Sequence, residues 1–567
     1  MKLFPRGRLR LAPRITLALM LGPVLAGLAG TLAPAFGLVP MPDAPPGLAA
    51  FRQLADWPGL RPAAVLSLTT GLASTALALA ITLAVLALLQ GTRAFALLLR
   101  LLSPLLAVPH AAVALGLAFL LAPSGWIARA LSPWATGWHA PPDLLTLNDP
   151  AGLALVAGLV AKEVPFLLLM ALAALPQTDA PRRRMVAATL GYGTAAGWAY
   201  TVLPALYRQM RLPVYAVLAY AMTVVDMAMI LGPTRPPTLA VQITLWMTDP
   251  SLAQRGMAAA AALLQLALVV GALLAWRAAE LLAKRLLICR AMAGRRGLAL
   301  DGWLGPLAGL LAALAVAAVA LGLAGLAVWS VAGLWQFPDA LPETLTLNTW
   351  SRAAPDLQAA TTLTLGLAAL ATATAIALVL ACLEAEARHG LRPTTRALWL
   401  LYLPLIVPQI AFLPGLQFLA LVTGAEGTAL AVAAAHLVFV LPYVFLSLAP
   451  PWRAWDGRTA TAAATLGASP FRIFWHLRLP MLLRPVLTAA AVGVAVSVGQ
   501  YLPTLLIGGG RVVTLTTEAV ALSSGGNRRI IGTYALLQMA LPALAFAMAI
   551  ALPALVFRNR RGMAVAA

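Results

Sequence analysis

The sequence predicts an all-α polytopic membrane protein with about 12 transmembrane helices. Hydrophobic residues make up 62% of the 567 residues and charged residues only 10%, and the mean hydropathy is +0.90. A soluble core does not require so much apolar sequence. Apolar runs of about 20 residues, the length that crosses a bilayer as a helix, recur along the chain. No run shows the alternating hydrophobicity of barrel strands, so a helical bundle is expected.

Each expected span is one of these apolar runs, and polar or proline-rich segments separate them. In chain order the spans are predicted at 15–36, 64–90, 95–122, 150–175, 213–232, 256–277, 303–335, 358–382, 397–422, 428–450, 485–507 and 534–557. Strict alternation over an even number of spans places both termini on the same side of the membrane.

Lysine and arginine residues assign the sides. With the N-terminus inside, 29 of these residues fall in predicted cytoplasmic segments and 9 in external loops, while Lys162 lies within a span. This asymmetry follows the positive-inside rule and predicts a multi-pass inner-membrane protein with both termini in the cytoplasm. The net charge of +21 then reflects contact with anionic membrane lipid, so no nucleic-acid partner is expected.

The N-terminus also resembles a secretory signal, because a basic stretch and an apolar run precede the small residues Ala33–Ala35. The length of the run, Pro34 and Pro40 favour a retained first span, and cleavage is the alternative. The two cysteines, Cys289 and Cys382, both map to the cytoplasmic side, where thiols stay reduced.

Internal repetition divides the chain into two halves. Pro109 and Gly116 match Pro408 and Gly415 at a common offset of 299 residues. Farther along, "KEVPFLLL" at 162–169 resembles "FVLPYVFL". Two six-span halves entering the membrane in the same orientation form a pseudo-dimer about an axis along the membrane normal, with a solute pathway between them.

The expected boundaries are a first half at 1–280, a basic cytoplasmic linker at 281–302 and a second half at 303–567. The phrase "AATLG" occurs once in each half, at 187–191 and at 463–467, and Leu-Pro follows it at the same distance each time. Both copies fall in predicted cytoplasmic loops, at 185–204 and 461–480.

The second copy predicts a short amphipathic helix on the membrane surface. Gly467 permits a turn and Pro470 suits the start of a helix. On this helix Phe471, Phe474 and Trp475 share one face, and Arg472 and Arg478 are expected to stay in water. A single copy would be explained as a connector resting on lipid. Two copies with matched spacing favour a docking role.

These loops resemble the cytoplasmic loop of type I ABC importer permeases, where Glu-Ala-Ala precedes Gly at the seventh position, an aliphatic residue at the seventeenth and a final Leu-Pro. In this register the first copy runs Met185, Val186, Ala187, then Gly191, Thr201, Leu203 and Pro204, and the second runs Thr461, Ala462, Ala463, then Gly467, Leu477, Leu479 and Pro480. The resemblance implies coupling loops whose candidate residues are Ala187, Ala188, Gly191, Leu203 and Pro204 in the first and Ala463, Ala464, Gly467, Leu479 and Pro480 in the second. Neither copy has the opening Glu, and Thr201 replaces the aliphatic residue of the first. The resemblance covers nearly the whole chain and is greatest to fused permeases of the thiamine and ferric-iron type.

The resemblance implies partners. In that family the loop is a coupling helix that docks in a groove of a separate ATPase, so two ATPase copies, which use ATP and Mg, and a periplasmic solute-binding protein are expected. None of Lys2, Lys162 or Lys284 follows a glycine, as the lysine of a phosphate-binding loop must. The chain is therefore expected to be no enzyme and to bind no cofactor or metal. Thiamine, ferric iron, a polyamine or another small solute would fit.

Two other classes compete with this interpretation. A secondary transporter of the major facilitator kind also has two six-span halves, but its Gly/Asp/Arg-rich signature is missing from "QGTRAFALLLR". An intramembrane enzyme would need clustered histidines or carboxylates. His110 and His436 stand alone in the sequence, and each is interpreted as a buried polar group with a satisfied hydrogen bond.

Four polar residues inside the predicted spans are candidates for the pathway: Lys162, Glu163, Asp226 and Gln500. An ionised group at membrane depth costs about 2.5–3.5 kcal/mol on insertion scales, so each needs a partner or a wet cavity. Lys162 and Asp226 have opposite signs and lie in consecutive spans, which predicts a structural ion pair. The alternative is that some of these residues line the pathway, where Asp226 could meet a cationic solute.

Overall fold

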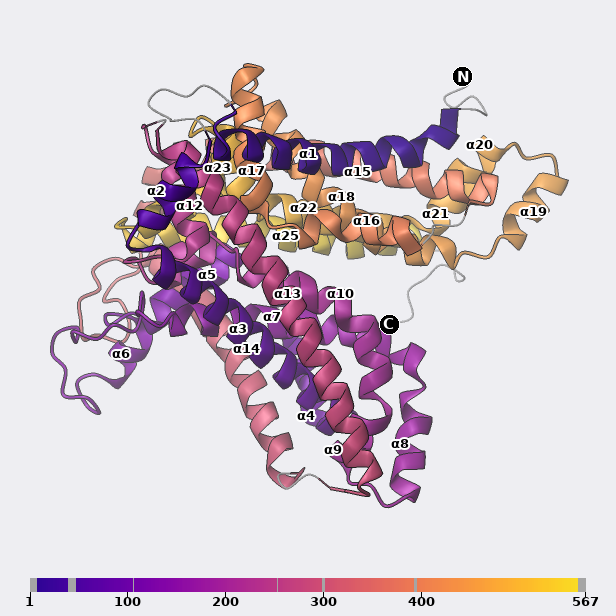
Figure 1. Ribbon diagram of the computed structural model, residues 1–567, viewed down its shortest axis with the longest axis horizontal. Coiled ribbons are helices and arrows are strands. Elements are labelled where there is room, and N and C mark those ends of the chain that lie inside the picture. Colours follow the sequence, from indigo (N-terminus) through magenta and orange to yellow (C-terminus); the bar gives the residue numbers. More distant parts are fainter. Residues whose placement is uncertain are drawn as a thin grey trace.

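The computed structural model describes residues 8–38, 47–105, 107–251, 253–297, 301–391 and 395–558. Across these ranges the regular structure is helical, apart from one isolated bridge between Ala332 and Leu345 (Figure 1). The predicted all-α membrane class is confirmed.

The first half contains seven long or medium helices and several short ones. The longer helices are α1 (Ala12–Ala35), α3 (Leu60–Leu88), α4 (Arg93–Leu105), α5 (His110–Leu121), α7 (Leu153–Ala174), α10 (Leu203–Ala221) and α13 (Gln254–Met292). The short helices are α2 (Ala49–Asp56), α6 (Trp126–Leu131), α8 (Ala180–Thr189), α9 (Thr194–Thr201), α11 (Asp226–Leu231) and α12 (Leu239–Thr248), with 3-10 turns η1 (Arg8–Leu11) and η2 (Leu175–Thr178).

The second half repeats this order of helices. Its longer helices are α14 (Asp301–Val331), α15 (Asn348–His389), α16 (Thr395–Ile406), α17 (Gln409–Val422), α18 (Ala429–Arg453), α22 (Leu483–Val498) and α25 (Arg528–Val556). Its short elements are α19 (Arg458–Thr465), α20 (Pro470–Ile473), the π-helical turn η3 (Phe474–Arg478), α21 (Leu479–Met481), α23 (Leu502–Gly508) and α24 (Leu515–Ser523).

The number of spans differs from the predicted 12. The described residues contain nine helices long and apolar enough to cross a membrane, or up to 11 when each bent pair counts as one span. The predicted span 213–232 falls outside this set, because α10 ends at Ala221 and its first turns carry Arg208 and Arg211. This part of the chain is therefore a helix with arginines in its first turns followed by a break, and not one uninterrupted apolar span.

Proline breaks two further predicted spans. The span at 397–422 bends by 92° between α16 and α17, where Pro408 precedes α17. The span at 95–122 is likewise divided between α4 and α5, and Pro109 precedes α5. Proline lacks the N–H needed to continue a helix and pushes the residue before it into an extended conformation. The matched prolines of the repeat therefore mark breaks within the spans.

The segment between the halves also differs from a plain linker. Helix α13 continues to Met292, so much of the predicted linker at 281–302 extends the last helix of the first half. Gly294 has φ of +66° and ends this helix in the left-handed conformation that glycine tolerates. Helix α14 begins at Asp301.

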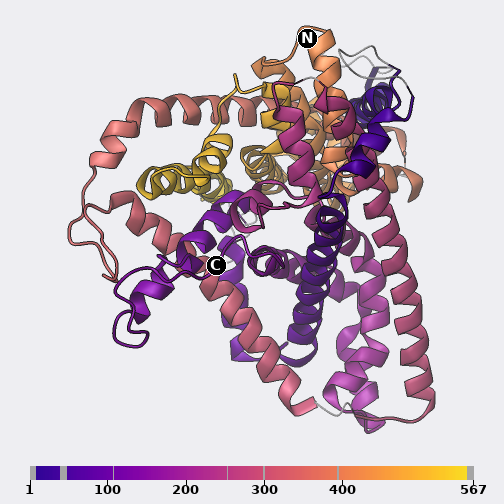
Figure 2. The same ribbon diagram turned by 60° about the vertical axis from the view of Figure 1, so that its left-hand side comes forward.

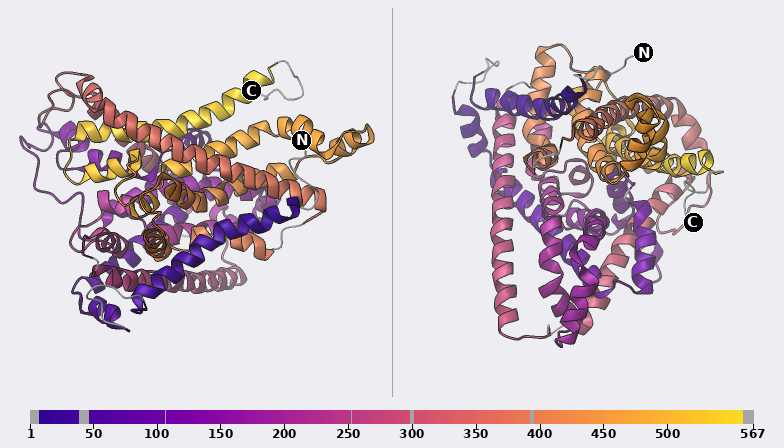
Figure 3. Two further views of the ribbon diagram at one scale, coloured as in Figure 1. Left: turned by 90° about the horizontal axis from the view of Figure 1, so that it is seen from above. Right: turned by 90° about the vertical axis from the view of Figure 1, so that its right-hand side faces the viewer.

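The first helix of each half packs on the other half. Helix α1 lies against the second half (Figures 2 and 3), and its Gly30 is so close to α17 that a Cβ there would be 2.7 Å from the carbonyl oxygen of Gly415. The hydroxyl of Thr31 donates to the Gly27 carbonyl at 2.9 Å and accepts from the Gly415 N–H at 3.0 Å. Small residues permit this backbone approach in a membrane, where van der Waals packing drives helix association.

The reciprocal contact joins α14 of the second half to α5 of the first. A Cβ on Gly322 would lie 2.7 Å from the carbonyl carbon of Gly116. Gly116 and Gly415 are the two glycines that the repeat matched at an offset of 299 residues. Equivalent positions therefore make equivalent contacts, and the halves exchange their first helices.

A second helix break in each half, after α10 and after α22, is stabilised through a buried glutamine on the last helix of that half. Gln265 of α13 donates to the carbonyl of Met222 at 2.9 Å, directly after α10 ends. Gln538 of α25 donates at 2.7 Å to Thr516, whose hydroxyl donates to the carbonyl of Val498 at the end of α22. A carbonyl without a helical partner is costly in lipid, so these donors stabilise the interruptions.

The two repeated loops lie at the same end of the molecule. Figure 1 places α8, α9, α19, α20 and the beginning of α1 toward one end, and α2, α6, α12 and α23 toward the opposite end. Figure 3 also shows the beginning of α1 (indigo) on the same side as the projecting orange part of the second half, which contains α19 and α20. Both loops can therefore face one aqueous compartment.

The glycine contact predicts different outcomes for two glycines on one helix. Gly30→Ala forces a methyl group into the α17 backbone, where overpacking costs about 1–3 kcal/mol. Gly22→Ala is the control on the same helix, because no described atom outside its own chain neighbours lies within 4 Å of its Cβ position, and the new methyl group meets only the adjacent Pro23. We expect Gly30→Ala to lower the thermal unfolding midpoint of the purified protein clearly more than Gly22→Ala does. Equal midpoints for both variants would contradict the close contact.

Candidate coupling loops and intramembrane polar residues

The first loop is a helix–turn–helix that packs on the membrane bundle. Helix α8 ends before Gly191, whose φ is +77°, and α9 follows. Ala187 is buried against Gly197, while Ala188 and Gly191 are exposed. Trp198 enters the same apolar core as Leu206 of α10. Half-buried Leu203 and exposed Pro204 begin α10.

The second loop has the same turn and a much more exposed surface. Gly467 has φ of +82° and follows α19, which carries Ala463 and Ala464. No residue of α19, α20 or η3 is buried. Leu466 is 88% exposed, and Phe471 and Trp475 are 44% and 46% exposed. The half-buried Leu479 and Pro480 then lead into α22.

The predicted amphipathic helix after Gly467 is only partly correct. Ser469 accepts a hydrogen bond from the Arg472 N–H at 3.3 Å, and Pro470 begins α20 as expected. After Ile473 the helix widens into the π-helical turn η3. Arg472 is exposed, as predicted, but Arg478 is not in water.

Arg478 is held by an ion pair that the sequence analysis missed. Its guanidinium lies 2.5 Å from the Glu384 carboxylate of α15 and stacks over Trp455, 4.5 Å from the ring centroid. Glu384 also pairs with Arg388 at 2.6 Å, and Arg388 donates to the carbonyl of Pro470 at 3.2 Å. The i, i+4 spacing of Glu384 and Arg388 was visible in the sequence; the long-range pairing with Arg478 was not.

Other polar contacts hold the two loops differently. In the first loop Arg184, which precedes the glycine turn, donates to the side-chain oxygen of Gln90 at 3.4 Å, whereas in the second loop Arg478, which follows the turn, pairs with a carboxylate. At the start of α19 the Arg458 side chain and backbone both donate to Asp456. These hydrogen bonds from Arg458 lower the pKa of Asp456 below its ordinary value.

Lys162 donates hydrogen bonds to backbone carbonyls at the break between α4 and α5. Its Nζ donates to the carbonyls of Leu105 at 3.2 Å and Val108 at 2.5 Å, which lie between α4 and α5. The ion pairs within the described part of the chain do not include the predicted pair of Lys162 and Asp226. The physical reason is that the break frees backbone carbonyls, and these compete for the ammonium group.

Glu163 and Asp226 instead lie around His110. Nε2 of His110 is 3.8 Å from Oε1 of Glu163, and its ring is 4.8 Å from that of Tyr220. Asp226 is buried at the start of α11, which packs against α5 and α7, the helices that carry His110 and Glu163. Tyr501 of the second half donates to Sδ of Met229 on α11 at 3.4 Å, so this polar group borders the interface between the halves.

Gln500 lies at the interruption between α22 and α23, beside His436. The hydroxyl of Thr504 donates to the Gln500 carbonyl at 2.7 Å, so it accepts from Nε2 of His436 at 2.9 Å. Nδ1 of His436 then accepts from Ser497 at 2.8 Å. His436 is thus a buried neutral group with both nitrogens bonded, as predicted.

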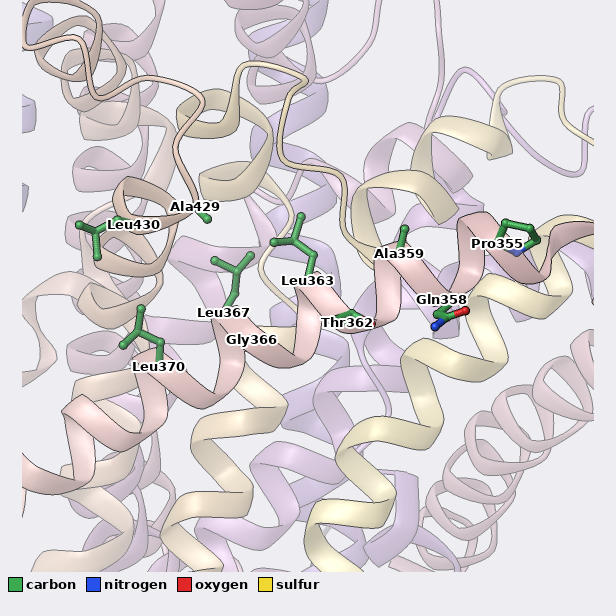
Figure 4. Close-up of a pocket in the computed structure, with 10 residues that line it drawn as sticks. All are labelled: Pro355, Gln358, Ala359, Thr362, Leu363, Gly366, Leu367, Leu370, Ala429 and Leu430. Carbon is green, nitrogen blue, oxygen red and sulfur yellow. The ribbon is translucent and has the colours of Figure 1, made fainter.

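An apolar groove lies away from these residues. It has a volume of about 730 Å³ and is lined by α15 and the start of α18 (Figure 4). Its lining is apolar apart from Gln358 and Thr362, and Leu370 and Leu430 are exposed. This surface suits acyl chains. Among the described residues, no group of three or more His, Cys, Asp or Glu side chains could hold a metal ion.

Comparison with known proteins gives the class. Residues 377–560 match the family described as "Binding-protein-dependent transport system inner membrane component". The inner membrane ABC transporter permease protein YnjC of Escherichia coli is 34% identical over 448 residues, which cover 78% of each chain. The chain therefore belongs to this family of ABC transporter permeases and is a multi-pass membrane protein.

Shorter similarities extend to permeases with different names. The molybdenum transport system permease protein ModB of Mycobacterium tuberculosis is 32% identical over 145 residues, 24% of this chain and 53% of that protein. The spermidine/putrescine permease PotC homolog of Mycoplasma genitalium is 31% identical over 90 residues, 16% of this chain and 31% of that protein.

The protein is accordingly the permease subunit of an ABC importer. The major facilitator alternative is wrong, because the relatives are ABC permeases. The chain is not itself an enzyme: in this family ATP hydrolysis belongs to a separate subunit, and the permeases work with ATPase and solute-binding partners and hold no cofactor themselves.

The Glu384–Arg478 pair predicts a specific role in holding the second loop. Glu384→Gln leaves the partly buried Arg478 without its counter-charge, and breaking such a pair by removing one partner costs about 3–5 kcal/mol when burial is complete. We expect faster amide exchange over 470–478. Glu386→Gln is the control, because it removes a more exposed pair with Arg453. Unchanged exchange over 470–478 in Glu384→Gln would show that the loop does not depend on this pair.

Proposed function

We propose that both repeated loops dock on ATPase subunits, one copy of the subunit at each loop, and transmit their closure to the membrane helices. The observation that carries this proposal is the shared turn: Gly191 and Gly467 both adopt positive φ, and both loops lie at the same end of the molecule. The exposed Leu466, Phe471 and Trp475 offer an apolar surface of the kind that inserts into a groove.

The proposed orientation places the two loops and both termini in the cytoplasm. The bias of 29 basic residues against 9 supports it. A periplasmic solute-binding protein then delivers solute to the opposite end. The expected division into halves at 1–280 and 303–567 fits this orientation, because each half contributes one loop.

The proposed solute pathway runs between the halves, past His110, Glu163 and Asp226. Two carboxylates at this place repel anions and attract cations, so we propose a cationic solute. Thiamine, ferric iron and polyamines all satisfy this condition. Identifying the ligand of the solute-binding protein that works with this permease tests the assignment, and an oxyanion ligand would contradict it.

The orientation can be tested with single cysteines. In a Cys289→Ser background, Ala468→Cys and Gly193→Cys should stay unlabelled by a membrane-impermeant thiol reagent applied from the periplasmic side. Leu341→Cys is the positive control, because Leu341 is exposed and its neighbour Ala340 accepts a hydrogen bond from Trp126 of α6, which lies at the opposite end. Ready labelling of Ala468→Cys or Gly193→Cys from outside would overturn the orientation.

The coupling role can be tested at the glycine turns. Gly467→Val and Gly191→Val place a β-branched residue at positive φ, which costs about 1–2 kcal/mol per residue and distorts the turn. We expect ATP-driven uptake to fall at least about ten-fold, the effect of a 1.4 kcal/mol loss in coupling, while membrane insertion persists.

Gly457→Val supplies the matched control for the second loop. Gly457 has φ of −63°, and among the described residues no atom beyond its chain neighbours lies within 4 Å of its Cβ position. Undiminished uptake in a variant with both Gly191 and Gly467 replaced would exclude the proposed coupling role.

A further inference from the structure

The segment that joins the two halves contacts the first loop at its turn. The N–H of Gly193 donates to the carbonyl of Arg296 at 2.8 Å. The Arg296 guanidinium also approaches the turn, since its Nη1 is 3.4 Å from the Cβ position of Gly191. Backbone and side chain of one linker residue therefore both lie against the glycine turn of the first loop.

A glycine turn at the end of α13 brings the linker to the first loop. The N–H of Gly294 donates to the carbonyl of Ala291, and φ of +66° at Gly294 reverses the chain direction. This is the usual left-handed termination of a helix. Because α13 is a continuous helix from Gln254 to Met292, it fixes the position of the three residues that follow the turn.

The equivalent position of the second loop is open. No described atom lies within 4 Å of the Cβ position of Gly467, although this glycine has nearly the same φ as Gly191. The two loops match in backbone, but among the described residues only the first has another segment of the chain at its turn. The first loop also has less free surface, since Ala195–Trp198 are buried, whereas no residue of α19, α20 or η3 is.

We propose that Arg296 forms part of the first ATPase-docking surface, which makes the two docking surfaces chemically different. The first surface combines the loop with a linker guanidinium and fits a partner carboxylate beside the turn. Within the described parts of the chain, the second consists of the loop and docks through Leu466, Phe471 and Trp475. This inference rests on the proposed coupling role of the loops.

The exposed basic residues of α8 support this chemistry. Arg182 and Arg183 are exposed on α8, the helix that leads into the turn, and Arg295 is exposed beside Arg296, so this part of the molecule carries several exposed positive charges. A guanidinium presents five donors in a planar fork that matches a carboxylate. Such rim charges contribute to specificity and orientation of a complex more than to its total affinity.

The test compares cross-linking of the ATPase to equivalent cysteines on the two loops. Leu190→Cys and Leu466→Cys each precede the glycine turn, and both leucines are exposed. In the complete complex of permease and ATPase, with Cys289 replaced by Ser, both cysteines should cross-link to the ATPase. Failure of both would refute the coupling role itself, separately from the role of Arg296.

The substitutions then isolate Arg296. We expect Arg296→Glu to lower cross-linking at Leu190→Cys about five-fold, the equivalent of losing one exposed ion pair at the upper end of its usual strength, and to leave Leu466→Cys unchanged. Arg296→Ala should lower it less. Arg295→Glu is the matched control, because it reverses the adjacent exposed charge.

Three results would overturn the proposal. Equal cross-linking in Arg296→Glu and the parent protein would show that the partner does not meet this residue. A rise at Leu190→Cys in Arg296→Ala would show that the linker obstructs docking. An equal loss of cross-linking at both loops would show a general change in the complex. Unchanged cross-linking at Leu466→Cys is therefore also the check that the variant is folded.

Discussion

The architecture depends on backbone contact between glycines of the two halves. Gly30 meets Gly415, and Gly116 meets Gly322, at distances that leave no room for a Cβ. In lipid there is little hydrophobic gain from burying one apolar helix against another, so close van der Waals packing must hold the helices together. The exchanged first helices therefore define how the halves are positioned, and with them the interface where Glu163 and Asp226 lie.

Several polar side chains inside the bundle complete backbone hydrogen bonds at helix breaks. Lys162 donates to carbonyls between α4 and α5, Gln265 to the carbonyl after α10, and Thr504 to the carbonyl of Gln500. An interrupted helix exposes polar groups that lipid cannot satisfy, and at these three breaks a side chain donates to the freed carbonyl. An intramembrane charge is consequently not always a solute ligand. Glu163 and Asp226 are the better candidates, because both lie around His110 near the interface.

The sequence predicted the helical class, most spans and the two repeated loops, because these depend on hydropathy and on local spacing. Pro109 and Pro408 were matched correctly, but their breaks were not anticipated, since hydropathy continues through a bend. The Glu384–Arg478 pair joins residues far apart in the chain, and no local pattern encodes it. The expected Lys162–Asp226 pair was wrong because charge matching ignores the carbonyls that a break releases.

The exchange of first helices also constrains biosynthesis. Thr31 accepts a hydrogen bond from a residue 384 positions later, so α1 enters the membrane long before its partner α17 exists. Its glycine-lined surface faces lipid or a chaperone during that interval. Helix α5 also lacks its partner when it is made, but only until α14 has been synthesised. Completion of the first half during translation does not complete its packing, and the newly made chain reaches its native arrangement only after the ribosome has delivered the ninth predicted span.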